Sequence, residues 1–131
     1  MKQSCSVIFF VVSFFASGLF AQDQATTSVA EIVICTSVEN KQPVGADSVF
    51  ASDVKQLTCF TRIVTQAEQS EVSHVWFYQD KEMTKVDLNV MGKSFRTWSR
   101  KTIIPEWKGD WRVEVQDSAG DVLSKISFKI R

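Results

Sequence analysis

The strongest constraint on the fold is a period-two alternation of apolar and polar residues, which recurs along most of the chain. Near the carboxyl terminus, for example, Ile126, Phe128 and Ile130 alternate with lysine and serine. Successive side chains of a strand point to opposite faces, so this pattern predicts strands with one face on a core and the other in water. The seven predicted strands cover residues 32–38, 57–64, 74–78, 85–90, 94–102, 111–116 and 122–130.

The segments between these strands carry the residues of turns, such as Pro43 and Gly45. A short connection over residues 117–121 predicts that the last two strands pair as a hairpin. No segment has helical spacing over three turns. Seven strands in about 100 residues favour one all-β domain over residues 29–131, an immunoglobulin-like antiparallel β-sandwich, with a small barrel as the alternative.

The amino-terminal segment has the order of a secretory signal peptide over residues 1–21. Lys2 precedes an apolar run, small residues follow, and Ala21 precedes a polar segment. This order predicts cleavage after Ala21. The alternative is a retained membrane anchor, but the run of about 15 apolar residues is shorter than the roughly 20 that a spanning helix needs. The mature chain would then begin with a polar lead-in over residues 22–28, contain no membrane span and be periplasmic or secreted.

Two cysteines, Cys35 and Cys59, remain after cleavage. In an exported domain of this size an even pair predicts a disulfide, and two buried free thiols are the alternative. Both cysteines precede Trp76, whereas antibody domains place a tryptophan between the two, so the likeness to them concerns architecture only. Without Lys2 the mature chain has 14 basic and 15 acidic residues. This balance does not predict nucleic acid as a partner.

The sequence contains few candidate catalytic residues. The chain has a single histidine, His74, and its cysteines lack the spacing of a zinc motif. It has no phosphate-binding glycine loop, nucleophile elbow or HExxH motif. A serine nucleophile at Ser99 would need partners that the sequence does not place beside it. We therefore expect no enzyme activity, no cofactor and no metal.

The segment from His74 to Val115 contains all four tryptophans, the only tyrosine and the only histidine. In a strand, every second residue lies on the same face. The pattern therefore predicts that alternate residues of 74–78 (His74, Trp76, Tyr78) share one face and that alternate residues of 96–100 (Arg96, Trp98, Arg100) share another. If those strands are neighbours, their faces form an aromatic shelf edged by guanidinium groups. Aromatic faces stack on sugar rings, and arginines bind acidic groups. The candidate ligand-binding residues are His74, Trp76, Tyr78, Arg96, Trp98, Arg100 and Lys101.

A structural interpretation of the same residues remains open. A small sandwich needs bulky core residues, which favours a core position for Trp76 and Trp111, and Trp107 lies in a predicted turn. Arg96 and Arg100 would in that case pair with acidic residues across strands, at Glu114 or Asp87.

Several short motifs occur in a fixed order along the chain. They are Cys59-Phe60-Thr61, His74-x-Trp76, Arg96-Thr97-Trp98-Ser99-x-Lys101, Gly109-x-Trp111-Arg112-Val113, Gly120-x-x-Leu123 and Phe128. From about Ala30 to the carboxyl terminus this series resembles the bacterial family known as domain of unknown function 2914. The resemblance implies an exported or membrane-attached bacterial protein with a β-rich domain, and it implies no activity. It places the family's motif residues at His74, Trp76, Arg96, Trp98, Ser99, Lys101 and Trp111.

From these observations we expect a non-catalytic binding module of the bacterial cell envelope, which holds a glycan, a peptide or an anionic component on its Trp/Arg face. The alternative is a structural or protein-interaction domain that docks on a periplasmic or membrane protein through a sheet edge.

Overall fold

The computed structural model describes residues 26–131, in which the chain forms ten strands and no helix. The larger sheet has five strands, in the order β4 (Val49–Phe50), β10 (Val122–Ile130), β9 (Gly109–Asp117), β6 (Gln69–Tyr78) and β7 (Lys81–Met91). The smaller sheet has three, in the order β1 (Thr27–Cys35), β5 (Gln56–Thr65) and β8 (Ser94–Thr102). All pairs within these sheets are antiparallel except β4 with β10.

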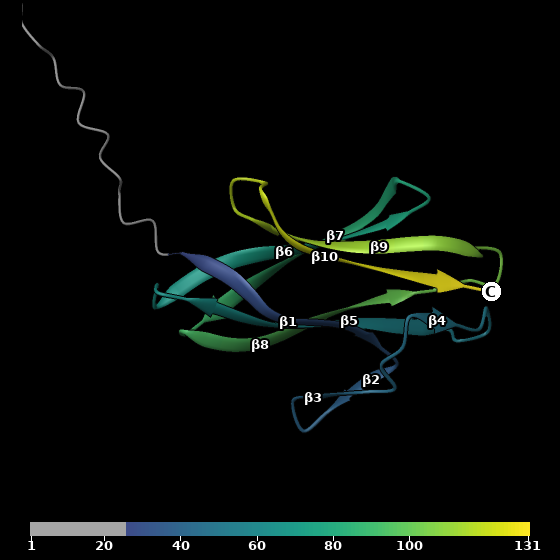
Figure 1. Ribbon diagram of the computed structural model, residues 1–131, viewed down its shortest axis with the longest axis horizontal. Coiled ribbons are helices and arrows are strands. Elements are labelled where there is room, and N and C mark those ends of the chain that lie inside the picture. Colours follow the sequence, from purple (N-terminus) through teal and green to yellow (C-terminus); the bar gives the residue numbers. More distant parts are fainter. Residues whose placement is uncertain (1–25) are drawn as a thin grey trace, which may run out of the picture.

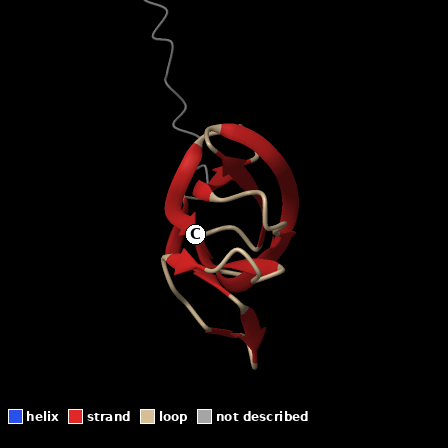
Figure 2. Ribbon diagram, turned by 90° about the vertical axis from the view of Figure 1, so that its right-hand side faces the viewer, coloured by secondary structure: helices blue, strands red, loops and turns tan. Residues whose placement is uncertain are grey.

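The two sheets form the two layers of a sandwich-like fold (Figure 1). A short hairpin of β2 (Ser37–Glu39) and β3 (Gln42–Val44) projects from the layer that contains β1, β5 and β8 (Figures 1 and 2). The hairpin covers part of the outer face of the three-stranded sheet, which is the face turned away from the five-stranded sheet.

The predicted all-β class is confirmed, as is the hairpin of the last two strands, β9 and β10. Strand β8 has the predicted bounds. The first predicted strand is instead divided at Thr36, whose backbone N–H and hydroxyl group both donate to the carbonyl oxygen of Val44. These bonds turn the chain out of the sheet and start the β2–β3 hairpin.

The predicted signal peptide, residues 1–21, lies outside the described residues, as does most of the lead-in. The lead-in was predicted to extend to Ser28, but β1 begins at Thr27, which pairs with Thr65 of β5. Among the described residues no helix is suited to crossing a bilayer.

The core lies between the two sheets and is filled by the residues of one parity from each strand. Trp76 and Trp111, which the sequence favoured as core residues, are 0% and 2% exposed. Trp111 stacks on Phe128 of β10 with ring centroids 5.9 Å apart, and Trp76 meets the same phenylalanine edge-on. A smaller cluster of Ile63, Val72, Val90 and Val115 forms a second part of the core.

The expected disulfide is absent, and both Cys35 and Cys59 are buried free thiols. The strand register explains this correction. Cys35 lies opposite Thr58, and Cys59 lies opposite Ile34. The two cysteines are therefore displaced by one residue along the paired strands, so their side chains point to opposite faces of the sheet. Burial raises the pKa of both thiols above the usual range, which makes them unreactive at neutral pH.

Candidate functional site

Strand β8 presents the predicted Trp/Arg face to solvent. Its Ser99 points into the core, because the Ser99 hydroxyl lies 2.7 Å from Nδ1 of His74 in the opposite sheet. Arg96, Trp98 and Arg100 have the other parity and therefore lie on the outer face of the three-stranded sheet. Their cross-strand partners on β5 are Arg62, Phe60 and Thr58, in that order.

Trp98 is only half-buried, and its ring covers Phe60. The two rings stack with centroids 6.2 Å apart and an interplanar angle of 18°. Phe60 is 0% exposed although it faces away from the main core. Trp98 therefore has two roles: it shields Phe60 from water and keeps part of its own ring at the surface.

A groove of about 490 Å³ lies beside Trp98. Its walls come from β5, from β8 and from the tip of the β2–β3 hairpin. The lining residues are Lys41, Arg62, Ser94, Phe95, Arg96 and Trp98. The candidate site, called the Trp98 groove below, therefore combines an aromatic ring with three cations.

Sequence reasoning missed Lys41 and Arg62. Arg62 has the outward parity of the strand over 57–64, so pairing that strand with 94–102 would have placed it beside Arg96. No sequence signal placed Lys41, because the hairpin that carries it folds back over the sheet through tertiary contacts.

Within the part of the chain that the structure describes, the cations of the groove form no ion pair. Among residues 26–131 the ion pairs involve only Arg112, with Asp80 and Glu114, and Lys129, with Asp110. Arg62 donates a long hydrogen bond of 3.4 Å to the Ser94 hydroxyl. Glu31 of β1 lies opposite Arg62 in the register but forms no ion pair with it. Neither Arg96 nor Arg100 pairs with Glu114 or Asp87, because β8 belongs to the other sheet.

His74 and Trp76 do not belong to this surface, because both are 0% exposed. They lie on β6, in the five-stranded sheet, so the predicted shelf that joins their face to the face of Arg96, Trp98 and Arg100 does not form. Burial lowers the pKa of His74 to about 4, so its ring is neutral at physiological pH.

A chain of four hydrogen bonds accounts for the polar atoms around His74. The Thr61 hydroxyl donates to the Thr97 carbonyl oxygen (3.0 Å), so it can only accept from His74 Nε2 (3.0 Å). The neutral ring then accepts at Nδ1 from the Ser99 hydroxyl, and Ser99 accepts from the Trp76 indole (3.0 Å). Every proton is used once, so His74 and Ser99 are held within the core by hydrogen bonds to buried partners.

Tyr78 and Lys101 lie at another place, at one end of the sandwich. The Tyr78 hydroxyl donates to the Lys108 carbonyl oxygen (2.6 Å), and its ring packs on Trp111 with centroids 4.9 Å apart. The Lys101 Nζ lies 4.8 Å from the centre of the Trp107 ring. Of the seven candidate residues, the structure therefore keeps Arg96, Trp98 and Arg100 together and separates the other four from them.

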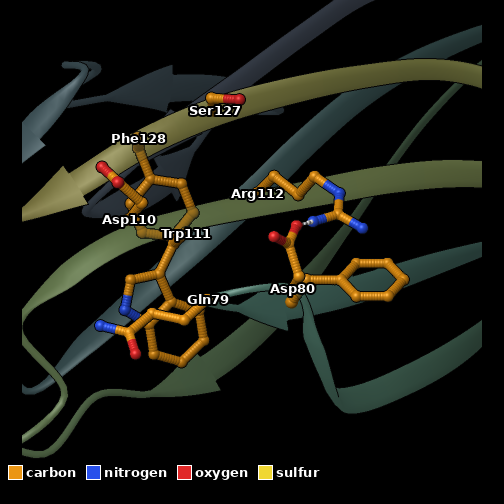
Figure 3. A pocket seen from close by; sticks show the side chains of 8 residues that line it. Gln79, Asp80, Asp110, Trp111, Arg112, Ser127 and Phe128 are labelled. Carbon is orange, nitrogen blue, oxygen red and sulfur yellow. Dashed lines mark hydrogen bonds and ion pairs between the residues drawn. The ribbon is translucent and has the colours of Figure 1, made fainter.

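A second groove, of about 620 Å³, lies where β6, β9 and β10 meet (Figure 3). Its central cation, Arg112, binds Asp80 and Glu114 and lies over the Phe77 ring at 4.0 Å. Because its charges are already neutralised within the chain, this groove is a weaker candidate than the Trp98 groove.

The comparisons with known proteins confirm the resemblance over part of the chain. Residues 69–130 match the model of the family described as "Protein of unknown function (DUF2914)". The match begins at Gln69 rather than near Ala30, so it includes Arg96 and Trp98 but neither Lys41 nor Arg62. No curated protein matches the chain in sequence.

The chain is similar in structure to parts of much larger proteins. These include a β-glucosidase from Kluyveromyces marxianus (TM-score 0.48, 12% identity), a β-D-glucoside glucohydrolase from Trichoderma reesei (0.48, 11%) and a β-glucosidase from Bifidobacterium adolescentis (0.46, 7%). The similarity covers 82% of this chain but only 15%, 19% and 17% of theirs, respectively. At these identities and TM-scores it supports no conclusion about activity.

Proposed function

We propose that the protein is an exported, non-catalytic binding module of the bacterial cell envelope, which holds an envelope component in the Trp98 groove. The signal-like order of residues 1–21 supports export. We also propose that the domain is an immunoglobulin-like sandwich, which the packing of a three-stranded sheet on a five-stranded one supports.

The observation that carries this proposal is the Trp98 groove itself. A partly exposed tryptophan lies beside three cations that form no ion pair with any described residue. Tryptophan and arginine are the residues that dominate binding energy at recognition sites. The hydrogen bonds that His74 and Ser99 form with buried partners support a non-catalytic role for these two residues.

The proposal is tested by exposing the immobilised mature domain to solubilised bacterial envelope and measuring the glycan-bearing material retained. We expect Trp98→Ala to lower retention about tenfold or more. The control is Trp107→Phe, because Trp107 is also a partly exposed tryptophan but lies at the end of the sandwich. Equal retention by folded Trp98→Ala and by the unchanged protein would rule the proposal out.

A second function is supported by the position of β8. This strand is one of the two edge strands of the three-stranded sheet, so one row of its backbone groups has no partner strand within that sheet. Such an edge can accept a strand from a periplasmic or membrane protein. Crosslinking in cells that traps one discrete protein at β8, without glycan, would favour this function over the first.

A further inference from the structure

The tip of the β2–β3 hairpin has a left-handed backbone at non-glycine residues, as does the turn between β6 and β7. Asn40 and Lys41 form a two-residue turn and both have positive φ, 50° and 58°. This is the geometry of a type I′ turn, in which asparagine suits the first position and glycine the second. The chain has lysine at the second position, and the Lys41 side chain lines the Trp98 groove. The turn therefore keeps a cation at a position whose backbone favours glycine.

Like charges also face each other on the floor of the groove. Arg62 and Arg96 are directly opposite on β5 and β8, on the same face of the sheet. Such a pair destabilises a sheet, and neither arginine forms an ion pair with a described residue, although Glu31 of β1 lies opposite Arg62 on the same face. The strained Lys41 and the opposed arginines are two independent features that lower the stability of the free protein. An anion bound among the three side chains would offset the repulsion between the two arginines, while the backbone of the turn would stay as it is.

The rest of the groove matches a sugar ring rather than a membrane or a nucleic acid. The partly exposed ring of Trp98 stacks on Phe60, and Ser94 lines the same groove. A saccharide has both a C–H face to stack on the indole and hydroxyl groups for Ser94. The large exposed hydrophobic residues do not line the groove, and the full sequence has a formal net charge of zero, which gives no general attraction for polyanions.

We infer that the Trp98 groove binds an acidic saccharide, with a sugar ring stacked on Trp98 and a carboxylate or phosphate group held by Lys41, Arg62 and Arg96. This inference rests on the proposed binding function and names the ligand class for the same site. Guanidinium groups bind both kinds of anion through paired hydrogen bonds, so the two acidic groups are separate arms of the test.

The test is a titration of the mature protein with three probes, monitored by tryptophan fluorescence and by calorimetry. Oligogalacturonate supplies carboxylates, glucose 6-phosphate supplies a phosphate, and uncharged galacto-oligosaccharide is the neutral control. We expect at least one acidic probe to bind about tenfold or more tightly than the neutral one. We expect that binding to weaken as salt is raised toward about 0.5 M, because the groove is open to solvent.

The variants are chosen so that loss of binding is not loss of folding. Lys41→Gly removes the cation and supplies the residue that the turn favours, and Arg96→Gln removes one of the opposed charges. We expect each variant to bind the acidic probe about tenfold more weakly, while its melting temperature stays equal to that of the unchanged protein or rises. Lys125→Gln, an exposed lysine on β10, is the matched control and should leave binding unchanged.

Equal binding of acidic and neutral saccharides would overturn this inference but leave the binding function standing. Binding to anionic lipid vesicles that Lys41→Gly abolishes, with no saccharide bound, would make a membrane the ligand and overturn it also. If none of the probes binds while envelope retention still depends on Trp98, the ligand class is wrong. If retention does not depend on Trp98, the proposed function itself fails.

Discussion

At Ser99 a single hydroxyl group accepts a hydrogen bond from the Trp76 indole and donates one to His74 Nδ1. Both partners are fully buried, so neither can turn to water if the hydroxyl is lost. A buried donor or acceptor without a partner costs about 1–3 kcal/mol. The side chain that resembled a nucleophile in the sequence is therefore a polar link within the core.

Ser99→Ala should lower the free energy of unfolding by about 2–4 kcal/mol, because it leaves two buried groups unpaired. Urea unfolding followed by tryptophan fluorescence measures this value. Ser127→Ala, an exposed serine on β10, is the control and should change stability by less than about 0.5 kcal/mol. A Ser99→Ala protein as stable as the control variant would contradict the directed chain of hydrogen bonds.

The β2–β3 hairpin is the element that turns a flat Trp/Arg face into a groove. Its return to the sheet depends on Gly45, whose φ is 71°. A Cβ atom at Gly45 would lie 2.2 Å from Thr36 Oγ1, which is held by its bond to the Val44 carbonyl oxygen. Glycine is therefore required here both for backbone conformation and for close approach.

Gly45→Ala should destabilise the protein by about 2–3 kcal/mol and lower the affinity of the Trp98 groove for any ligand, because the hairpin must shift. Gly120→Ala is a matched control. Gly120 also has a positive φ, 86°, but no atom lies within 4 Å of its Cβ position. It should lose only about 1 kcal/mol and bind normally. Thermal unfolding of both variants gives the comparison, and equal losses would mean that the contact with Thr36 is unimportant.

On the scale of the whole molecule, His74 links the two sheets. It lies on β6 and bonds to Thr61 of β5 and Ser99 of β8, so it is deprived of water only when the sheets are packed together. Its protonation is therefore coupled to global unfolding. In the unfolded chain the pKa is near 6.5, and burial lowers it to about 4 in the folded protein.

Because the folded-state pKa is depressed, the unfolded chain binds the proton first as the pH falls. The contribution of His74 to stability is complete above pH 6.5 and is lost between about pH 6.5 and 4, by up to about 3 kcal/mol. About 1 kcal/mol should be gone at pH 5.5. Urea unfolding at several pH values measures the loss.

The same prediction has a direct spectroscopic check, because His74 is the only histidine in the chain. In a mature protein made without a histidine tag, its ring proton shifts in NMR spectra should stay constant from pH 7.5 to 5. A titration midpoint near 6.5 would show that the ring is reached by water and would contradict its burial.

Local patterns predicted the strands well, because alternation depends only on neighbouring residues. Strand β8 has the predicted bounds, and Arg96, Trp98 and Arg100 share the predicted outward face. The disulfide prediction failed for a related reason. The number of cysteines and the compartment say nothing about parity, and in the observed register Cys35 and Cys59 point to opposite faces.

The sequence by itself therefore determined that residues 26–131 are all-β and that Arg96, Trp98 and Arg100 lie together, since both follow from the two-residue repeat of a strand. Only the tertiary structure decided that β6 and β8 belong to different sheets, which buries His74 and separates it from Trp98. It also decided that Lys41 and Arg62 join Trp98. The alternation of a strand shows which residues share a face. Pairing between segments that are distant in the chain decides which face is buried in the core and which cations lie next to each other.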